Sequence, residues 1–271
     1  MSPKPLKAYK NLEFLNSSEA RTLRILSEFL EPAARFRKEK VVDTVVFFGS
    51  ARTLSEDDAR AALSDIRKRF DGDDTPEAAQ AVRHAEKRVE LARYYEDART
   101  LARKLTQWSI DINGAENRFV IASGGGPGIM EAANRGASEV EGGRNIGLNI
   151  SIPMEQDSNP YITPDLNFEF HYFFARKFWF IYLAKALVVF PGGFGTMDEL
   201  FEVLTLLQTR KLSKRMPVVI YGTEYWNRVI NFEAMVENQM INEADLQLIH
   251  FSDSPDDAFE YLANNLTNHK G

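Results

Sequence analysis

Two glycine-rich segments are the first residues whose types and spacing suggest chemistry. Residues 123–128 (SGGGPG) and 191–196 (PGGFGT) each follow an apolar run and precede a helical pattern. Glycines at the start of a helix let an anion approach the backbone, where free N–H groups and the helix dipole attract negative charge. Neither segment has the Gly-Lys-Ser/Thr of a P-loop or the glycine spacing of a dinucleotide fingerprint. The pattern predicts phosphate binding, and a plain tight turn is the alternative at each place.

Glu199 lies three residues after Thr196, next to the second glycine segment. This spacing fits an S/T-x-x-E capping box, which stabilises a helix by about 1 kcal/mol. The spacing alone favours this cap. The functional alternative is a carboxylate beside a phosphate site, which could act on water or on a ribose hydroxyl.

A cationic pair, Arg176 and Lys177, lies within the aromatic run 173–180 (FFARKFWF). One hypothesis is that both side chains extend their charged ends to the surface while their stems cover apolar rings. The other is that Arg176 is directed at an anionic ligand, with aromatic rings nearby to stack on a base.

The elements that must position these residues alternate between strand and helix. Helical patterns cover residues 129–136, 173–185 and 197–210, and further helices are expected after residue 221 and at the C-terminus. Strands are expected within 41–52, 119–122, 145–152, 167–170, 186–190, 217–221 and 248–252. This alternation predicts an α/β, Rossmann-like, doubly wound parallel sheet with helices on both faces. Ligands bind beyond the carboxyl ends of such strands, near a change in strand order, where Gly49 and Ser50 form a third turn.

Two further helical regions are expected outside this alternation. Leu23, Leu26 and Leu30 have helical spacing, and Pro32 follows them. Residues 55–108 are charged and helical, with a break at 71–76 (DGDDTP). We therefore expect an N-terminal helical extension over residues 1–40, and a domain over 41–271 with a helical insertion at about 54–92.

The composition excludes several classes of protein. Of the 271 residues, 44% are hydrophobic, and 33 basic against 39 acidic residues give a net charge of −6. A core can therefore form, and nucleic-acid binding through a positive field is disfavoured. There is no cysteine, and the four histidines lack metal-ligand spacing, so we expect no metal. The N-terminus lacks a signal peptide, and charges interrupt residues 173–191, so we expect a cytoplasmic protein with no membrane partner.

Four segments resemble one known family. Residues 191–199 (PGGFGTMDE) are similar to the P-G-G-x-G-T-x-x-E signature of the LOG family, which comprises cytokinin riboside 5′-monophosphate phosphoribohydrolases and related nucleotide nucleosidases. Arg176-Lys177 resembles the R-K pair of that family. Residues 123–131 resemble its first glycine turn and helix, and residues 48–52 (FGSAR) its opening strand and turn. The resemblance runs from about residue 45 to 221, with an interruption near 54–92.

The resemblance implies a Rossmann-like homodimer that hydrolyses a nucleoside 5′-monophosphate to free base and ribose 5-phosphate, with no cofactor. It implies that Arg176 and Glu199 are catalytic and that the glycine turns hold the phosphate. A carboxylate suits this reaction, because cleavage of the N-glycosidic bond builds positive charge on the ribose. Glu131 is a weaker candidate for contact with a ribose hydroxyl. The expected substrate-binding residues are Gly49, Ser50, Ser123, Gly124, Gly125, Gly126, Glu131, Lys177, Gly192, Gly193, Gly195 and Thr196.

Several alternatives remain open at this point. The extension and the insertion could reshape the base pocket, so an adenine nucleotide such as AMP is a safer expectation than a cytokinin. The same turns resemble those of molybdenum-cofactor carrier proteins, which makes a non-catalytic nucleotide or cofactor binder the second hypothesis. A lysine decarboxylase, a label often given to the family, is the third. It is disfavoured because that chemistry normally needs pyridoxal phosphate on a lysine, with an acid for the ring nitrogen.

Overall fold

The centre of the molecule is a parallel sheet. The computed structural model describes residues 5–113, 116–153, 157–212 and 216–267. Within these residues, seven strands pair in the order β4-β3-β2-β1-β5-β6-β7, and each neighbouring pair is parallel. The strands are β1 (Thr44–Phe48), β2 (Val120–Ser123), β3 (Asn145–Ile150), β4 (Asn167–Phe170), β5 (Ala184–Val189), β6 (Val218–Tyr221) and β7 (Ile249–Ser252). The predicted Rossmann-like, doubly wound sheet is confirmed.

Alternating side chains on the strands build a core on each face of the sheet. Val45 and Phe47 of β1 lie in one buried cluster, and Val46 and Phe48 lie in the other, because successive residues of a strand point to opposite faces. The first cluster is covered by α5 (Arg93–Asn113), α6 (Ile129–Ser138) and α11 (Pro255–Thr267). The second is covered by α2 (Arg21–Lys38), α7 (Phe173–Tyr182), α8 (Phe194–Gln208), α9 (Thr223–Val229) and α10 (Phe232–Glu237).

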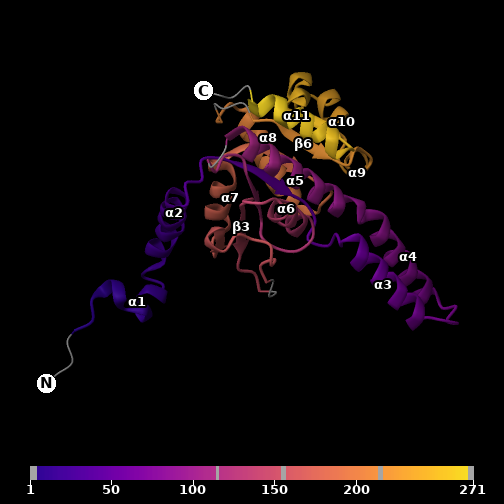
Figure 1. Cartoon of the computed structure of the whole chain (residues 1–271), viewed down its shortest axis with the longest axis horizontal. Helices are drawn as coiled ribbons and strands as arrows, with labels where there is room; N and C mark the ends of the chain where they lie inside the picture. The colour runs from indigo at the N-terminus through magenta and orange to yellow at the C-terminus, as the bar shows by residue number, and fades with distance from the viewer. Residues whose placement is uncertain (1–4, 114–115, 154–156, 213–215, 268–271) are drawn as a thin grey trace.

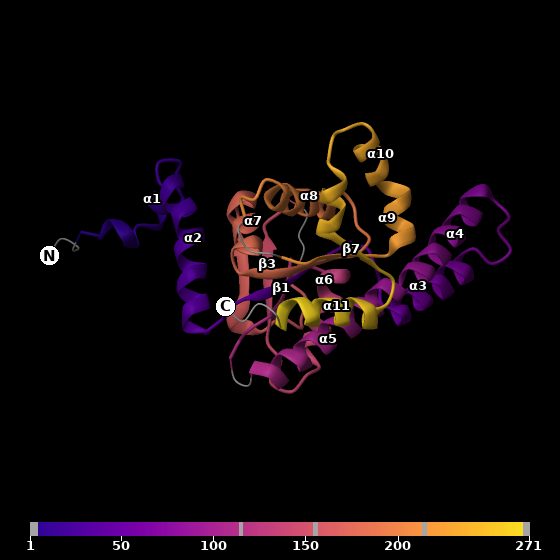
Figure 2. The ribbon, with the colours of Figure 1, turned by 90° about the horizontal axis from the view of Figure 1, so that it is seen from above.

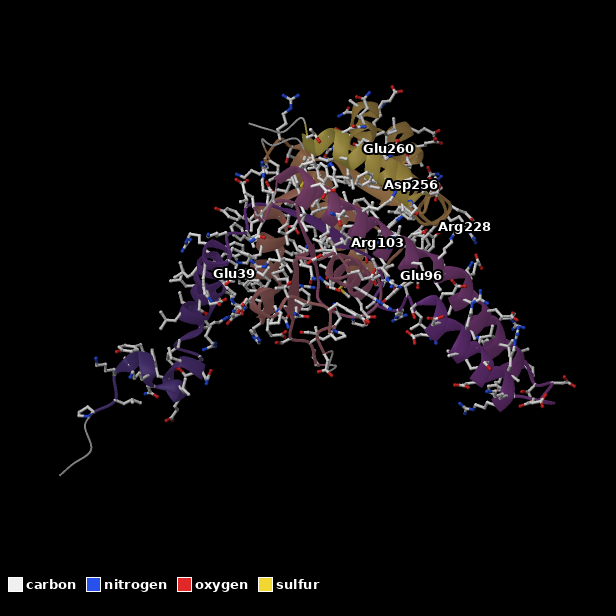
Figure 3. All side chains as sticks on the ribbon, in the orientation of Figure 1. Glu39, Glu96, Arg103, Arg228, Asp256 and Glu260 are labelled. Atoms are coloured by element: carbon white, nitrogen blue, oxygen red, sulfur yellow. The ribbon has the colours of Figure 1, made fainter. Side chains whose placement is uncertain are left out.

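The N-terminal helices lie at one end of the molecule (Figures 1 and 2). They are a single 3₁₀ turn (Ala8–Lys10), α1 (Leu12–Asn16) and α2. The leucine spacing correctly predicts a helix, but α2 does not end before Pro32: it continues through this buried residue to Lys38. The three leucines are themselves exposed, and Phe36 on another face of the helix is buried against the sheet. The end of α2 is tied to the core through Glu39, labelled in Figure 3, which pairs with Arg144 at 2.7 Å.

A helical hairpin projects from the other end (Figures 1 and 2). It consists of α3 (Glu56–Arg69) and α4 (Pro76–Leu91), which begin at side-chain caps from Ser55 and Thr75. The break predicted at 71–76 is the turn between them. Arg67 and Glu86 pair across the hairpin at 2.8 Å. Figure 3 shows charged side chains along the outer surfaces of this hairpin.

One expected boundary is wrong. The helical pattern over 173–185 predicts a helix that continues to Lys185, whereas α7 ends at Tyr182 and β5 begins at Ala184. The reason is tertiary, because Ala184 already pairs with Thr44 of the central strand β1. This early ending leaves Arg176 and Lys177 in the middle of a helix that leads directly into the sheet.

Candidate functional site

Three glycine turns meet at the carboxyl edge of the sheet, and Ser50 joins them. β2 and β5 lie on either side of β1, so the turns that follow these strands are neighbours. The Ser50 amide donates to the Pro191 oxygen at 3.0 Å, and the Ser50 oxygen accepts a bond from the Ile129 amide at 3.1 Å. Gly128, at φ +73°, lies so close to the Ser50 backbone that a side chain could not fit there. Gly49 is equally close-packed, since a Cβ atom would lie 2.7 Å from Ile129.

The first glycine turn is held from within by asparagines. The buried Ser123 hydroxyl donates to Asn134 Oδ1 at 2.7 Å and accepts a bond from the Gly125 amide at 3.0 Å. Asn159 Nδ2 donates to the oxygens of Gly125 and Gly126 at 3.0 and 3.1 Å. Because a trans peptide directs its N–H opposite to its C=O, the Gly126 amide points away from Asn159.

These asparagines are residues that the sequence does not single out. Asn134 and Asn159 are buried, and each belongs to a network that also includes Asn145. The sequence signal is weak, because an isolated asparagine is more often a surface or turn residue. One hint is that Asn134 lies among the apolar residues of 129–137, on what becomes the buried face of α6.

The second glycine turn opens directly into α8. Gly192 is buried and Gly193 is the N-cap residue, with no side-chain cap. The helix already includes Phe194, Gly195 and Thr196, and the Met197 amide donates to the Gly193 oxygen at 3.0 Å. The three amides before Met197 are therefore at the positions that have no partner within a helix. Gly193 and Gly195 are exposed, with open space beside them, so a ligand can approach these amides.

The capping-box interpretation of Glu199 is wrong. An N-cap residue precedes its helix, whereas Thr196 is inside α8 and buried, and Glu199 lies a turn further along. Glu199 is itself only 7% exposed. Burial raises the pKa of Glu199 to about 7, against the opposing charges of Lys177 and Arg176. A carboxyl with such a pKa can take up and release a proton near neutral pH.

Arg176 points inward to the edge of the sheet. Its Nε donates to the Leu148 oxygen at 2.7 Å, and its Nη2 lies 3.5 Å from the Gly124 oxygen. Its guanidinium carbon is 5.0 Å from the centre of the Phe180 ring. Burial lowers the pKa of Arg176, and the charges of Glu199 and Glu169 oppose this effect. An arginine keeps its charge in proteins, so a fixed positive charge lies beside the first glycine turn.

Lys177 is held by the carboxylates of α8. Its Nζ lies 2.7 Å from Glu202, 2.9 Å from Asp198 and 3.7 Å from Glu199. Burial alone lowers the pKa of Lys177, but the bonds to Glu202 and Asp198 and the charge of Glu199 outweigh burial and raise it. Lys177 therefore joins α7 to α8 and partly compensates the charge of Glu199.

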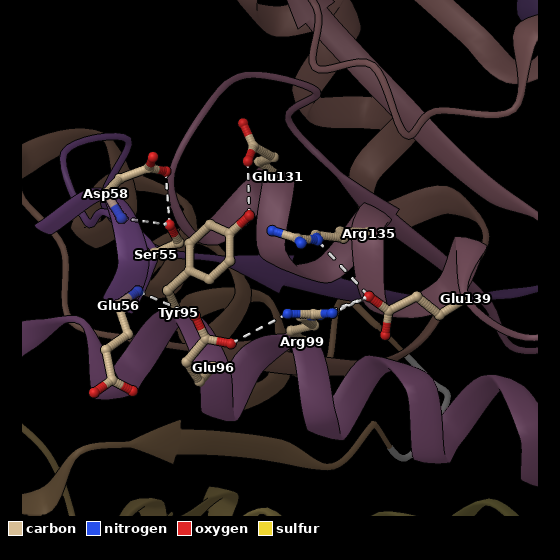
Figure 4. A network of polar contacts seen from close by, with 9 residues as sticks. All are labelled: Ser55, Glu56, Asp58, Tyr95, Glu96, Arg99, Glu131, Arg135 and Glu139. Atoms are coloured by element: carbon tan, nitrogen blue, oxygen red, sulfur yellow. Dashed lines mark hydrogen bonds and ion pairs between the residues drawn. The ribbon is translucent and has the colours of Figure 1, made fainter. Parts of the chain in front are cut away.

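Glu131 approaches the turns from the opposite face of the sheet. It lies in the first turn of α6 and accepts a 2.6 Å bond from the Tyr95 hydroxyl (Figure 4). Burial and Glu131 raise the pKa of Tyr95, so this hydroxyl stays a donor. A separate set of drawn contacts joins Arg135 and Arg99 at Glu139, and Arg99 binds Glu96, which accepts a bond from the Glu56 amide at the start of α3. Tyr95 is another residue that the sequence does not indicate, and it joins α5 to Glu131 at the start of α6.

Comparison with known protein families finds one model that matches this chain. The sheet and its turns define a Rossmann-like α/β protein. Residues 130–262 match the family model described as "Possible lysine decarboxylase". This match, the glycine-turn signature and the Arg176-Lys177 pair are together consistent with a member of the LOG family. Such a domain suggests a nucleotide-processing role and is compatible with an enzyme.

The other comparisons are more distant. One solved structure that the chain resembles is the molybdenum cofactor binding protein from the phototrophic bacterium Rippkaea orientalis. Its identity is 18%, its TM-score is 0.42, and the match covers 63% of this chain and 88% of that chain. No curated protein matches the chain. In the part of the chain that the structure describes, no three His, Cys, Asp or Glu side chains are grouped to hold a metal, and no helix meets the length and apolarity needed to span a membrane.

Proposed function

We propose that the protein hydrolyses the N-glycosidic bond of a purine nucleoside 5′-monophosphate, either AMP-like or a cytokinin nucleotide. The products are the free base and ribose 5-phosphate. The observation that carries this proposal is the burial of Glu199 in the first turns of a helix that starts from an uncapped glycine segment. Burial there raises the pKa of Glu199 to about 7. A nucleotide binder needs the glycine segment but has no need of a carboxyl that titrates near neutral pH.

The phosphate is bound where backbone amides converge. The amides of Phe194, Gly195 and Thr196 and the outward amide of Gly126 supply the donors. Arg176 adds a positive charge beside Gly124, where it either positions the phosphate or stabilises the leaving purine. Glu131, held by Tyr95, is available to a ribose hydroxyl.

Glu199 acts on the water and on the ribose. As the bond between C1′ and the base nitrogen breaks, its electron pair leaves with the base and positive charge grows on the ribose. The ionised Glu199 stabilises this charge and accepts a proton from the attacking water, whose oxygen forms the new bond to C1′. The departing base takes up a proton from solvent and Glu199 returns to solvent the proton that it accepted, so the overall change consumes one water.

The geometry disfavours a decarboxylase. A Schiff base needs a neutral lysine amine. Lys177, the lysine beside the turns, is ion-paired with Asp198 and Glu202, and its pKa is raised. It is therefore poorly suited to hold pyridoxal phosphate.

A product assay tests the proposal. AMP, GMP, IMP, CMP, UMP and isopentenyladenosine monophosphate are incubated with the protein, and base and ribose 5-phosphate are separated by chromatography. We expect release from the purine nucleotides, no release from adenosine added as a control without phosphate, and loss of release in Glu199→Gln with binding retained. Tight binding without release from any nucleotide would instead favour the non-catalytic binding protein.

Three further properties belong to this proposal. We propose a cytoplasmic homodimer, in which residues 1–40 form an extension of a domain over 41–271 with an insertion at about 54–92. Light scattering at micromolar protein concentration tests the dimer, and a monomeric mass would contradict it.

A further inference from the structure

Glu28 of α2 fastens α7 at two separate points. Its carboxylate oxygens accept bonds from the His171 amide at 2.8 Å and the Tyr172 amide at 3.1 Å, just before α7 begins. Its main-chain oxygen accepts a bond from Trp179 Nε1 at 2.8 Å, two turns into the same helix. A single residue of the N-terminal region therefore contacts α7 through both its side chain and its backbone.

Pro32 explains why the Glu28 oxygen is available. In an α-helix the amide four residues later donates to each carbonyl oxygen. Residue 32 is a proline inside α2, which has no N–H to give. The indole of Trp179 supplies the missing donor, so the proline that sequence rules place at the end of the helix instead creates a contact point for α7.

The two contact points enclose Arg176. The Tyr172 oxygen accepts bonds from the Ala175 and Arg176 amides, so the fixed start of α7 leads directly to Arg176. Trp179 follows three residues later, on the next turn. The guanidinium of Arg176 then reaches the Leu148 oxygen at 2.7 Å and the Gly124 oxygen only at 3.5 Å. Its place beside the glycine turn thus depends on where α7 starts and how it is rotated.

We propose that Glu28 is a positioning residue for Arg176, and that helix α2 is thereby part of the support of the active site. This inference rests on the proposed hydrolase function for its kinetic consequence. It gives the N-terminal extension a role in catalysis without any contact to the substrate. Misplacement of a reacting group by about 1 Å can reduce a rate by up to about 100-fold, so the loss of this anchor should be measurable.

Two variants and a matched control test the proposal in the full chain. Glu28→Gln keeps the size of the side chain but places an N–H group against one of the two amides. Trp179→Phe removes the indole donor, keeps a ring in the core and serves as the second variant if the first does not fold. Glu31→Gln is the control, because Glu31 lies on the same helix and its carboxylate binds Arg35.

Three quantities are measured for each variant: kcat/KM for base release, the thermal midpoint, and the NMR signal of Arg176 Nε–H in protein labelled with ¹⁵N-arginine. The signal is assigned with Arg176→Lys. We expect kcat/KM to fall about tenfold or more in Glu28→Gln and Trp179→Phe, with a shifted Nε signal and a midpoint within a few degrees of the wild type. Glu31→Gln should match the wild type in all three.

The proposal is overturned if the Arg176 signal stays unchanged in both variants, whatever the activity, or if the signal shifts while kcat/KM does not. An equal loss of activity in Glu31→Gln overturns it too. If the wild type hydrolyses no nucleotide, the proposed function has failed, and the Nε signal alone then decides whether Glu28 positions Arg176.

Discussion

The burial of Glu199 should make its charge costly to the folded protein. The pKa of this carboxyl rises from an ordinary value of 4.5 to about 7. Each pKa unit corresponds to about 1.4 kcal/mol, so the ionised carboxylate lowers the free energy of unfolding by about 3 kcal/mol. Glu199→Gln removes this cost. Since the folded pKa is the higher one, the cost is absent below about pH 4.5, grows as the pH rises, and is complete above about pH 7.

Urea denaturation at several pH values measures this effect. The free energy of unfolding of Glu199→Gln minus that of the wild type should be about 2 to 3 kcal/mol larger at pH 8 than at pH 5. Glu202→Gln is the matched control, because it removes a carboxylate that contacts Lys177 more closely and leaves Glu199 in place. A difference between Glu199→Gln and the wild type that does not change with pH would refute the assignment of a buried, titrating carboxyl.

Three further variants test the parts of the site. Arg176→Ala should lower kcat/KM for base release about 100-fold or more, and wild-type turnover would remove Arg176 from the site. Gly124→Ala places a Cβ atom 2.5 Å from Arg176 Nη2. We expect it to displace the guanidinium and to cost about tenfold in kcat/KM, while an unchanged rate would show that this contact is unimportant. Asn159→Leu removes the side-chain donor of the Gly125 and Gly126 oxygens, and only the Gly125 oxygen keeps a bond, from the amide of residue 159. It should reduce the free energy of unfolding by about 2 to 4 kcal/mol and weaken nucleotide binding in calorimetry. Wild-type values would show that the Asn159 side chain does not hold the first glycine turn.

The strands and the three turns could be predicted from the sequence because their signals are local. Apolar β-branched runs followed by glycine occur at 44–50, 120–126 and 184–193, and the structure has a strand and a turn at each. Parallel pairing then requires that the turns share one edge of the sheet. The joining role of Ser50 follows from this arrangement, but its two bonds connect segments whose separation no local pattern encodes.

Prediction from the sequence fails where tertiary contacts outweigh local rules. A proline usually breaks or kinks a helix interior, but α2 continues through Pro32, and Trp179 satisfies the Glu28 oxygen that the proline leaves free. Thr196 and Glu199 have the spacing of a cap, but the buried turn at Gly192 starts the helix earlier. Asn159 has no local signature, because its role depends on the position of another loop.

The bonds of Ser50 also bear on how the protein folds. They join segments that are distant in the chain and that follow the central strands of the sheet, so the entropy of closing long loops must be overcome before the turns take their shape. Opening at the sheet edge formed by β7 can leave the turns intact, whereas separation of β1 from β5 removes them. A ligand that binds only the assembled turns therefore stabilises the central strands as a unit, by about 2.7 kcal/mol at 100 times its Kd. Bound substrate would therefore raise the free energy of global unfolding of the sheet.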